Sequence, residues 1–376
     1  MNPLLFILAL LGVFSLLNIY IYKRLISRLS ISERYKHYFK LFLHLNLFGI
    51  FLYTLGRYYV DFANWLYFLF SIPIGLLFLL FCTAILYDIS HLFLSLTPLE
   101  KNRRKFLKNS LDIGAVATAS LITARSIYEA RTVVLEDKEI KIKNLQKPYK
   151  ILQLSDIHIG GLINADFIRE IVQRVNACNP DLVVITGDLI DTDVNKAKDI
   201  LQELKNLDSK YGTYFIVGNH EYFHDIATII KRVKELGIRV LENENVYIGE
   251  KNQGFNLAGV YDLFGYRALK FIPDINAALK GRDTSSPSVL LAHQPKFLEE
   301  INDSQKIDLV LSGHTHGGQL LPFRVLVRLQ QPYISGLHQH TPLTQIYVNK
   351  GTGFWGPPMR LGASAEITQI TLLPHT

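Results

Sequence analysis

The N-terminal third of the chain is built from long hydrophobic runs. Residues 1–22 contain no charged side chain, and residues 41–56 and 62–87 are two further uncharged runs. A helix needs about 20 apolar residues to cross a bilayer, and a helix without a polar face is poorly suited to water. The pattern therefore predicts three membrane spans. The run at 41–56 is short and includes His44 and Asn46, but Lys40 and Arg57 at its ends can extend to the interface.

Beyond residue 130 the hydrophobic runs become short and alternate with segments of helical periodicity. Five apolar runs predict buried strands at 149–155, 181–185, 213–217, 288–292 and 308–312. Helices are predicted at 165–176, 196–207, 226–236 and 295–301. Further strands are expected at 255–260, 347–349 and 366–372, and an opening hairpin at 132–135 and 139–142. The alternation predicts an α/β fold, with N-terminal transmembrane helices followed by a two-sheet αβ sandwich.

The two patterns divide the chain into a membrane region, residues 1–130, and one large domain, residues 131–376, with a linker at 125–130. Charge follows the same division. The net charge is +7, and the first 130 residues hold 13 Lys or Arg against 6 Asp or Glu, so the rest of the chain is neutral. A nucleic-acid-binding protein would carry its basic charge on the folded domain, so nucleic acid is not expected as a partner.

The basic residues also predict how the spans are oriented. Six bases follow the first run: Lys23, Arg24, Arg28, Arg34, Lys36 and Lys40. Five more lie between residues 101 and 108, whereas the loop between the second and third runs has only Arg57, beside Asp61. Because positively charged loops stay in the cytoplasm, the amino terminus is expected outside. The chain is thus expected to be a multi-pass membrane protein, and if residues 113–124 also cross, the large domain is extracytoplasmic.

The basic segment at 102–108 is also a candidate export signal. It reads Asn-Arg-Arg-Lys-Phe-Leu-Lys, which resembles the twin-arginine motif, and the uncharged residues 113–124 behind it have the length of a signal h-region. The alternative is a basic loop that only marks the cytoplasmic side. Ala115 and Ala117 stand within the apolar run instead of after it, so the sequence defines no cleavage site.

Asp, Asn or His residues follow all five predicted strands. They are Asp156 and His158, Asp188 and Asp191, Asn219 and His220, His293, and His314 and His316. Sites in open α/β sheets form at the carboxyl ends of the strands. A single His after a strand is usually a hydrogen-bonding residue, but five such endings in one domain favour a shared metal site. Carboxylate, imidazole and amide donors suit Mn²⁺, Fe or Zn²⁺.

These blocks resemble the calcineurin-like metallophosphoesterases. The matching residues are Asp156-x-His158, Gly187-Asp188-x-x-Asp191, Gly218-Asn219-His220-Glu221, His293 and Gly313-His314-x-His316, over roughly residues 148–320. The extension Gly317-Gly318-Gln319 is similar to the membrane-linked bacterial branch of the family. The resemblance implies two divalent metal ions: Asp156, His158 and His316 hold one, Asn219, His293 and His314 hold the other, and Asp188 bridges them. It also implies that water attacks the phosphorus, so that no Ser or Cys nucleophile is needed.

The resemblance also suggests roles for the neighbours of the ligands. His220 is expected to act as a general acid toward the leaving group, and Asp191 to support the imidazole without binding metal. Glu221 is expected either to belong to the site or, equally, to be a solvated charge at the start of a helix. Asp191 is followed by Thr192-Asp193 and not by the Arg-Gly of serine/threonine protein phosphatases, which disfavours a phosphoprotein substrate.

Together these features predict a membrane-anchored, metal-dependent phosphoric ester hydrolase. The expected substrate is a phosphodiester or pyrophosphate in a lipid or cell-envelope molecule, because a membrane anchor keeps an enzyme at that surface. Alternatives are a metal-stabilised binding or receptor protein with little catalysis, a phosphomonoesterase, and a nuclease. The loop at 351–360, which carries Phe354 and Trp355, is expected either to touch substrate or membrane or to be an ordinary packed turn.

The loop charges and the arginine pair lead to a test of membrane topology. A reporter fused after Thr376 should be active only in the extracytoplasmic compartment. Changing Arg103 and Arg104 to Lys should block its export if the pair is an export signal, because that motif requires arginine. Normal export of the double variant, measured by reporter activity in separated compartments, would disprove the motif but not the topology.

Overall fold

The structure is a computed structural model that describes residues 3–375, and it divides into two compact units. The first unit contains the chain up to Tyr128 together with Gly356–Leu361. The second unit contains Glu129–Trp355 and the chain from Gly362 onward. The short loop Gly356–Leu361 thus belongs to the first unit although it stands near the end of the sequence.

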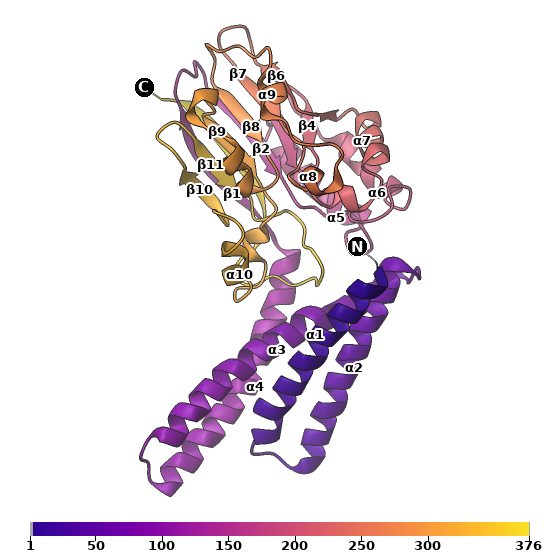
Figure 1. Cartoon of the computed structure of the whole chain (residues 1–376), viewed down its shortest axis with the longest axis vertical. Coiled ribbons are helices and arrows are strands. Elements are labelled where there is room, and N and C mark those ends of the chain that lie inside the picture. Colours follow the sequence, from indigo (N-terminus) through magenta and orange to yellow (C-terminus); the bar gives the residue numbers. More distant parts are fainter. Residues whose placement is uncertain (1–2, 376) are drawn as a thin grey trace. The chain divides into compact units, whose positions relative to one another are not determined.

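Long helices form the first unit. They are α1 (Pro3–Arg24), α2 (Glu33–Tyr58), α3 (Asn64–Leu96) and α4 (Lys101–Arg131), with a short 3₁₀ turn, η1 (Ile26–Arg28), after α1. Helices α1, α2 and α3 lie side by side (Figure 1). Among the described residues, these three are the helices long and apolar enough to cross a membrane. They extend beyond the predicted apolar runs, because charged residues such as Glu33 and Lys36 continue the helical backbone past the hydrophobic stretch.

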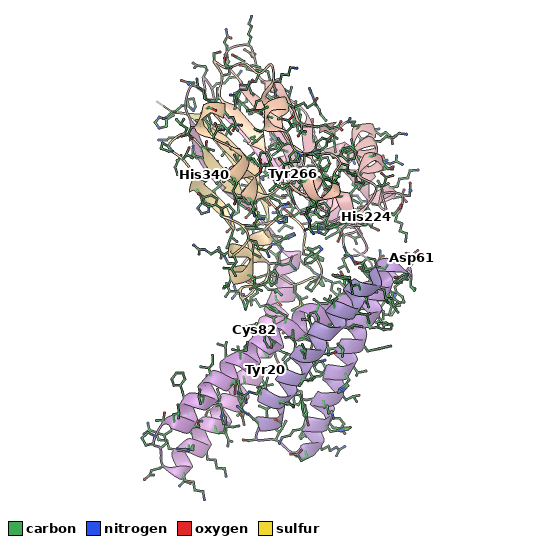
Figure 2. All side chains as sticks on the ribbon, in the orientation of Figure 1. Tyr20, Asp61, Cys82, His224, Tyr266 and His340 are labelled. Carbon is green, nitrogen blue, oxygen red and sulfur yellow. The ribbon has the colours of Figure 1, made fainter. Side chains whose placement is uncertain are left out.

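Helix α4 corrects the linker predicted at 125–130, since the helix runs without interruption through these residues to Arg131. The basic segment and residues 113–124 belong to the same helix. Its Asp112 carboxylate is almost fully buried and accepts hydrogen bonds from Tyr87 of α3 (2.7 Å), the Ser30 backbone (2.8 Å) and Lys108 (2.6 Å). On α1, Tyr20 lies 3.4 Å from Asp88 of α3 (Figure 2). Polar side chains thus join the helices inside this unit.

The second unit is a sandwich of two sheets. In the described residues each sheet has six strands, in the orders β1-β12-β2-β3-β4-β5 and β10-β11-β9-β8-β7-β6. The first sheet contains β1 (Val133–Ile142), β2 (Tyr149–Leu154), β3 (Leu182–Thr186), β4 (Thr213–Ile216), β5 (Arg239–Val240) and β12 (Ala365–Pro374). The second contains β6 (Glu244–Ile248), β7 (Phe255–Gly259), β8 (Ser288–Leu291), β9 (Leu309–Ser312), β10 (Gly336–Gln339) and β11 (Gln345–Val348). The predicted two-sheet α/β architecture is confirmed.

Alternation along the strands explains the layering. In β3, Leu182 and Val184 face a core shared with the second sheet, whereas Val183 and Ile185 face the helices outside. The outer helices of the first sheet are α5 (Ala165–Ala177), α6 (Lys198–Gln202) and α7 (Ile226–Glu235). Helix α9 (Ile275–Leu279) and the 3₁₀ turn η4 (Pro295–Glu300) cover the second sheet. Each buried aliphatic side chain contributes about 1.5–3 kcal/mol, so both faces of each sheet must be covered.

The hairpin predicted at 132–135 and 139–142 is wrong. Those residues form one ten-residue strand, β1, which pairs in parallel with β12 from Val133 opposite Ala365 to Ile142 opposite Pro374. The intervening charged residues suggested a turn, but β1 is an edge strand and its side chains can reach water. Glu136, for example, forms an ion pair with Lys350 at 3.3 Å. Residues far apart in the sequence supply the partner strand that a hairpin would have supplied locally.

Candidate metal centre

The polar residues predicted from the strand ends come together at one edge of the sandwich. Strands β2, β3 and β4 are parallel neighbours in the first sheet, and β8 and β9 are parallel neighbours in the second. Their carboxyl ends therefore point the same way within each sheet. The residues that follow them converge into two clusters whose donor atoms lie within 4.8 Å of one another in each cluster.

The first cluster consists of Asp156, His158 and His316. The Nε2 atoms of the two imidazoles are 3.0 Å apart, and His316 Nε2 is 3.4 Å from Asp156 Oδ1. All three side chains are buried. Two imidazoles and a carboxylate from segments far apart in the sequence thus aim their donor atoms at one point.

The second cluster consists of Asp188, His293 and His314. His293 Nε2 lies 3.3 Å from Asp188 Oδ2 and 3.1 Å from the amide oxygen of Asn219. Asp188 Oδ2 is also 3.9 Å from His158 Nε2 of the first cluster. One carboxylate therefore stands between the two clusters.

The donor set fits a pair of divalent cations. Nitrogen and oxygen ligands that bind at about 2.0–2.2 Å lie about 3.0–3.5 Å from one another. The separations of 3.0 Å and 3.4 Å in the first cluster and 3.3 Å in the second fall in this range. Burial, with repulsion from neighbouring histidines, lowers the pKa of His158 and of His314 to about 3. Both rings are therefore neutral near pH 7, as a metal ligand must be. For His293, in contrast, the charge of Asp188 outweighs burial and raises the pKa well above its usual range.

Five of these residues adopt a backbone conformation that the sequence did not predict. Asp156, His158, Asp188, His314 and His316 all have φ between 50° and 69°. This left-handed region is uncommon for residues other than glycine and costs on the order of 1 kcal/mol per residue. Hydrogen bonds between the loops after β2 and β3 hold the strain, because the amides of Asp156 and His158 donate to the carbonyls of Gly187 and Asp188, each at 3.0 Å. Such strain is typical of functional sites.

Two glycines give the carboxylates room. A Cβ atom at Gly218 would lie 2.2 Å from Asp188 Oδ1, and one at Gly313 would lie 2.3 Å from Asp156 Oδ2. Both distances are far below van der Waals contact, and the obstructing atoms are buried metal-type donors. Any side chain at either position would displace the carboxylate, which explains why glycine precedes the polar residue in both blocks.

Glu221 has a structural role that its sequence context does not reveal. Its carboxylate is completely buried, which rules out the alternative of a solvated charge. Oε1 accepts from the amides of Leu189 (2.8 Å) and Ile190 (3.0 Å), and Oε2 from those of Asp188 (3.1 Å) and Gly218 (2.7 Å). Burial and the charge of Asp188 raise the pKa of Glu221 to about 7, against these hydrogen bonds. Glu221 therefore ties the β3 loop to the β4 loop from beneath.

His220 lies beside the clusters and is oriented by Asp191. His220 Nδ1 is 2.8 Å from Asp191 Oδ1, so the hydrogen bond expected from the spacing is present. The Nε2 atom is 3.9 Å from Asp188 Oδ2. His158, Asp191 and His220 also form a third group whose donor atoms are within 4.8 Å of one another, so geometry alone admits His220 as a ligand.

Aromatic side chains flank His220. The rings of Phe223 and Trp355 stand edge-on to the imidazole, at centroid distances of 5.2 Å and 5.9 Å. Phe223 is 53% exposed and Trp355 is 44% exposed, whereas Phe354 is packed in the core. Of the two expectations for the 351–360 loop, turn packing thus describes Phe354, and Trp355 faces solvent next to the site. His340, by contrast, contacts Tyr333 beyond the end of β10, outside these clusters (Figure 2).

Comparisons with known proteins show which family the chain resembles. Residues 149–318 match the Calcineurin-like phosphoesterase family. The chain is 46% identical over 275 residues to an uncharacterized metallophosphoesterase of Helicobacter pylori, covering 73% of each chain. It is 35% identical to an uncharacterized metallophosphoesterase of Campylobacter jejuni, covering 98% of both. A Danio rerio protein named "Transmembrane protein with metallophosphoesterase domain" is 35% identical over 69% of this chain and 62% of its own length.

The position of Asp188 between the clusters leads to a prediction about metal content. Asp188→Asn should bind less than half as much metal as the native protein, because the remaining donors lose their shared negative charge. The helix content should change little, since the substitution leaves the apolar side chains of both core clusters unchanged. Elemental analysis and far-ultraviolet circular dichroism measure the two quantities. Two metals per chain in the variant would contradict a bridging role.

The four amides that donate to Glu221 lead to a second prediction. Glu221→Gln replaces one acceptor atom by a donor and leaves two buried N–H groups unpaired, at about 1–3 kcal/mol each. We expect a melting temperature lower by several degrees, together with weaker metal retention, because the loops carrying Asp188 and Asn219 lose their tie. Glu250→Gln, on the exposed surface, is the matched control and should melt like the native protein. Native-like melting of Glu221→Gln would contradict the assigned role.

Proposed function

The chain belongs to the calcineurin-like phosphoesterase family, and from this premise we propose that it is a membrane-anchored phosphodiesterase or pyrophosphatase acting on a lipid or cell-envelope molecule. The observation that carries the proposal is the pair of donor clusters sharing Asp188 beside His220, in a chain with three apolar helices. Metal-dependent hydrolysis of phosphoric esters follows from the family. The type of bond that is cleaved and the class of substrate are what we propose here.

In this proposal Asp156, His158 and His316 hold one divalent cation, Asn219, His293 and His314 hold a second, and Asp188 contacts both. When bound, such a pair would polarise phosphoryl oxygens and lower the pKa of water to about 7. The protein's own contribution is a rigid donor array. The glycines next to the carboxylates and the hydrogen bonds under Asp188 fix the array before substrate arrives, so little reorganisation remains for the reaction itself.

We assign the general-acid role to His220 and the positioning role to Asp191. The hydrogen bond from His220 Nδ1 to Asp191 Oδ1 fixes the tautomer, so that Nε2 is the atom that delivers a proton. The negative charge of Asp191 favours the protonated imidazole that a general acid needs. An alkoxide leaving group is a strong base, and His220 would protonate it as the phosphorus–oxygen bond breaks, an effect of about 10² to 10⁴ in rate.

Two features support a lipid or envelope substrate. The three candidate membrane helices keep the chain at a membrane, and the exposed rings of Phe223 and Trp355 give the surroundings of His220 an apolar character. The sequence after Asp191 lacks the Arg-Gly of protein phosphatases, and the neutral charge beyond residue 130 disfavours nucleic acid. The competing function is a binding protein without catalysis, and the complete His220–Asp191 pair disfavours it.

The proposal is tested with purified full-length protein in lipid nanodiscs. Activity is measured on bis-p-nitrophenyl phosphate, p-nitrophenyl phosphate, phosphatidic acid and a lipid pyrophosphate, after metal removal and addition of Mn²⁺, Fe²⁺ or Zn²⁺. Higher kcat/KM on diesters or pyrophosphates than on monoesters supports the proposal. A preference for monoesters would make the protein a phosphomonoesterase, and no turnover with any metal would favour the binding role.

A variant series tests the general acid. His220→Ala should keep the native metal content but lose about 10² to 10⁴ in rate on an alkyl phosphodiester, because the departing alkoxide needs the proton. On a p-nitrophenyl ester, whose leaving group is a weak base, the loss should be much smaller. Asp191→Asn should show the same pattern more weakly. Equal losses on both substrates would indicate charge stabilisation, and loss of metal in His220→Ala would make His220 a ligand.

A further inference from the structure

In the segment that follows the His314–His316 loop, apolar side chains are exposed and a polar side chain is buried. It contains a short helix, α10 (Arg324–Arg328), flanked by Leu321 and Leu329. Leu321, Val325, Leu326 and Leu329 are 53%, 66%, 52% and 80% exposed. Gln331, a polar residue, is instead buried, and its side-chain oxygen accepts from the Lys296 amide at 3.0 Å. A helix on the surface of a water-soluble domain shows the opposite arrangement.

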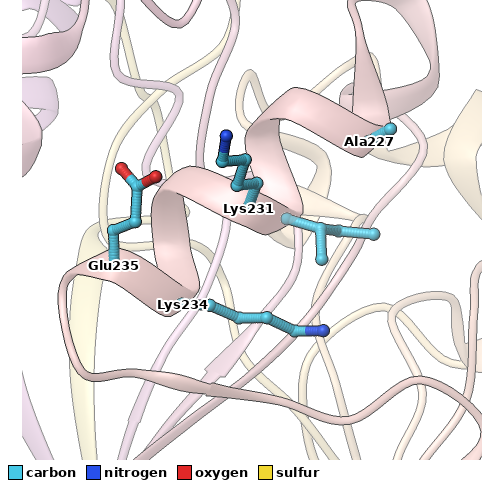
Figure 3. Close-up of a pocket in the computed structure, with 5 residues that line it drawn as sticks. Ala227, Lys231, Lys234 and Glu235 are labelled. Carbon is cyan, nitrogen blue, oxygen red and sulfur yellow. The ribbon is translucent and has the colours of Figure 1, made fainter.

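Helix α7 in the same unit shows the ordinary arrangement. Its Ile229, Ile230 and Val233 are buried, whereas Lys231 and Glu235 are exposed beside a shallow hollow (Figure 3). The unit can therefore cover its sheets with conventionally amphipathic helices. The outward apolar side chains near α10 are a local departure that the packing of the sandwich does not require.

The segment that contains this surface carries no acidic residue. No Asp or Glu occurs between Asp308 and Glu366 in the sequence, whereas Arg324 and Arg328 lie on α10 itself. Arg328 is exposed among the apolar side chains. Apolar side chains with interspersed arginines and no acidic residue suit the interface of an anionic bilayer, where acyl chains and phosphate groups meet.

The surface is coupled to the candidate site through a short path. Gln319 Nε2 donates to the backbone carbonyl of Trp355 at 2.8 Å, and the Trp355 amide donates back to Gln319 Oε1 at 3.1 Å. Trp355 in turn stands beside His220. Gln319 also follows the His316-Gly317-Gly318 turn directly. Whatever occupies the α10 surface therefore lies within a few residues of the metal-type donors.

We propose that Leu321, Val325, Leu326 and Leu329, with Arg328, form a membrane-docking surface that rests on an anionic lipid bilayer. The occupant is the bilayer because the same chain carries three candidate membrane spans, so a lipid surface is always within reach of a unit tethered to them. The docked surface would bring the candidate site to the level of the lipid headgroups. This inference concerns a surface and stands whether or not the substrate proposed above is correct.

Depth measurements on the full-length chain test the proposal. In a Cys82→Ala and Cys178→Ser background, a nitroxide label is attached at Leu326→Cys or, as a control on α7, at Lys231→Cys. The proteins are placed in nanodiscs of phosphatidylcholine and phosphatidylglycerol. Oxygen concentrates in lipid, whereas a nickel complex stays in water. The ratio of the oxygen collision rate to the nickel collision rate should therefore be several-fold higher at position 326 than at position 231. Equal ratios at the two positions would overturn the proposal.

Matched variants test whether these side chains and the lipid charge hold the surface on the bilayer. Adding Leu329→Glu should raise nickel collision at position 326 about threefold or more, because a charge at the interface weakens insertion. Lys251→Gln lowers the net charge by the same amount at a position outside the surface and should change nothing. Nanodiscs without phosphatidylglycerol should also raise nickel collision at position 326. If nickel collision did not change, the preference for anionic lipid would be overturned. Spin–spin broadening that vanishes on dilution with unlabelled protein would show a second copy on the surface and overturn bilayer docking.

Discussion

A carboxylate removed from water must find its compensating charges and hydrogen bonds inside the protein, and at Asp188 this constraint organises the site. Burial opposes ionisation of this group, but the charge and hydrogen bond of His293, with the charge of His220, hold the pKa of Asp188 well below its usual range. Asp188 Oδ1 also accepts the His220 amide at 2.8 Å. The position of one side chain thereby fixes the loops after β3, β4 and β8 relative to one another.

The strain and the buried Glu221 follow from the same constraint. To bring donors from both sheets to one point, the backbone turns through left-handed conformations at five non-glycine residues, and this has a cost of several kcal/mol in total. Glu221 offsets part of it by gathering four amides from two loops. The unit thus gives up some folding stability to hold an array that is already arranged for cations. Such preorganisation is expected of a catalytic metal site.

The surroundings of the site differ in character from its interior. Polar donors are concentrated in the buried clusters, whereas the exposed neighbours of His220 are the rings of Phe223 and Trp355, and the next segment presents leucines and an arginine to the outside. A site for a small soluble phosphate ester has no need of such a rim. The apolar rim and the three helices suited to a bilayer are the basis of the lipid substrate that we propose.

The two-sheet class, the membrane helices and the convergence of polar residues at strand ends could be predicted from the sequence, because they depend on local periodicity and on the shared direction of parallel strands. The pairing of β1 with β12 could not, because residues more than 200 positions apart make that contact. Glu221 was equally hidden, since a glutamate before a helical turn looks solvated until the loops that bury it are in place. Nor could hydrophobicity alone reveal that the leucines around α10 point outward. Tertiary structure decided each of these, because burial and backbone strain depend on which distant segments pack together.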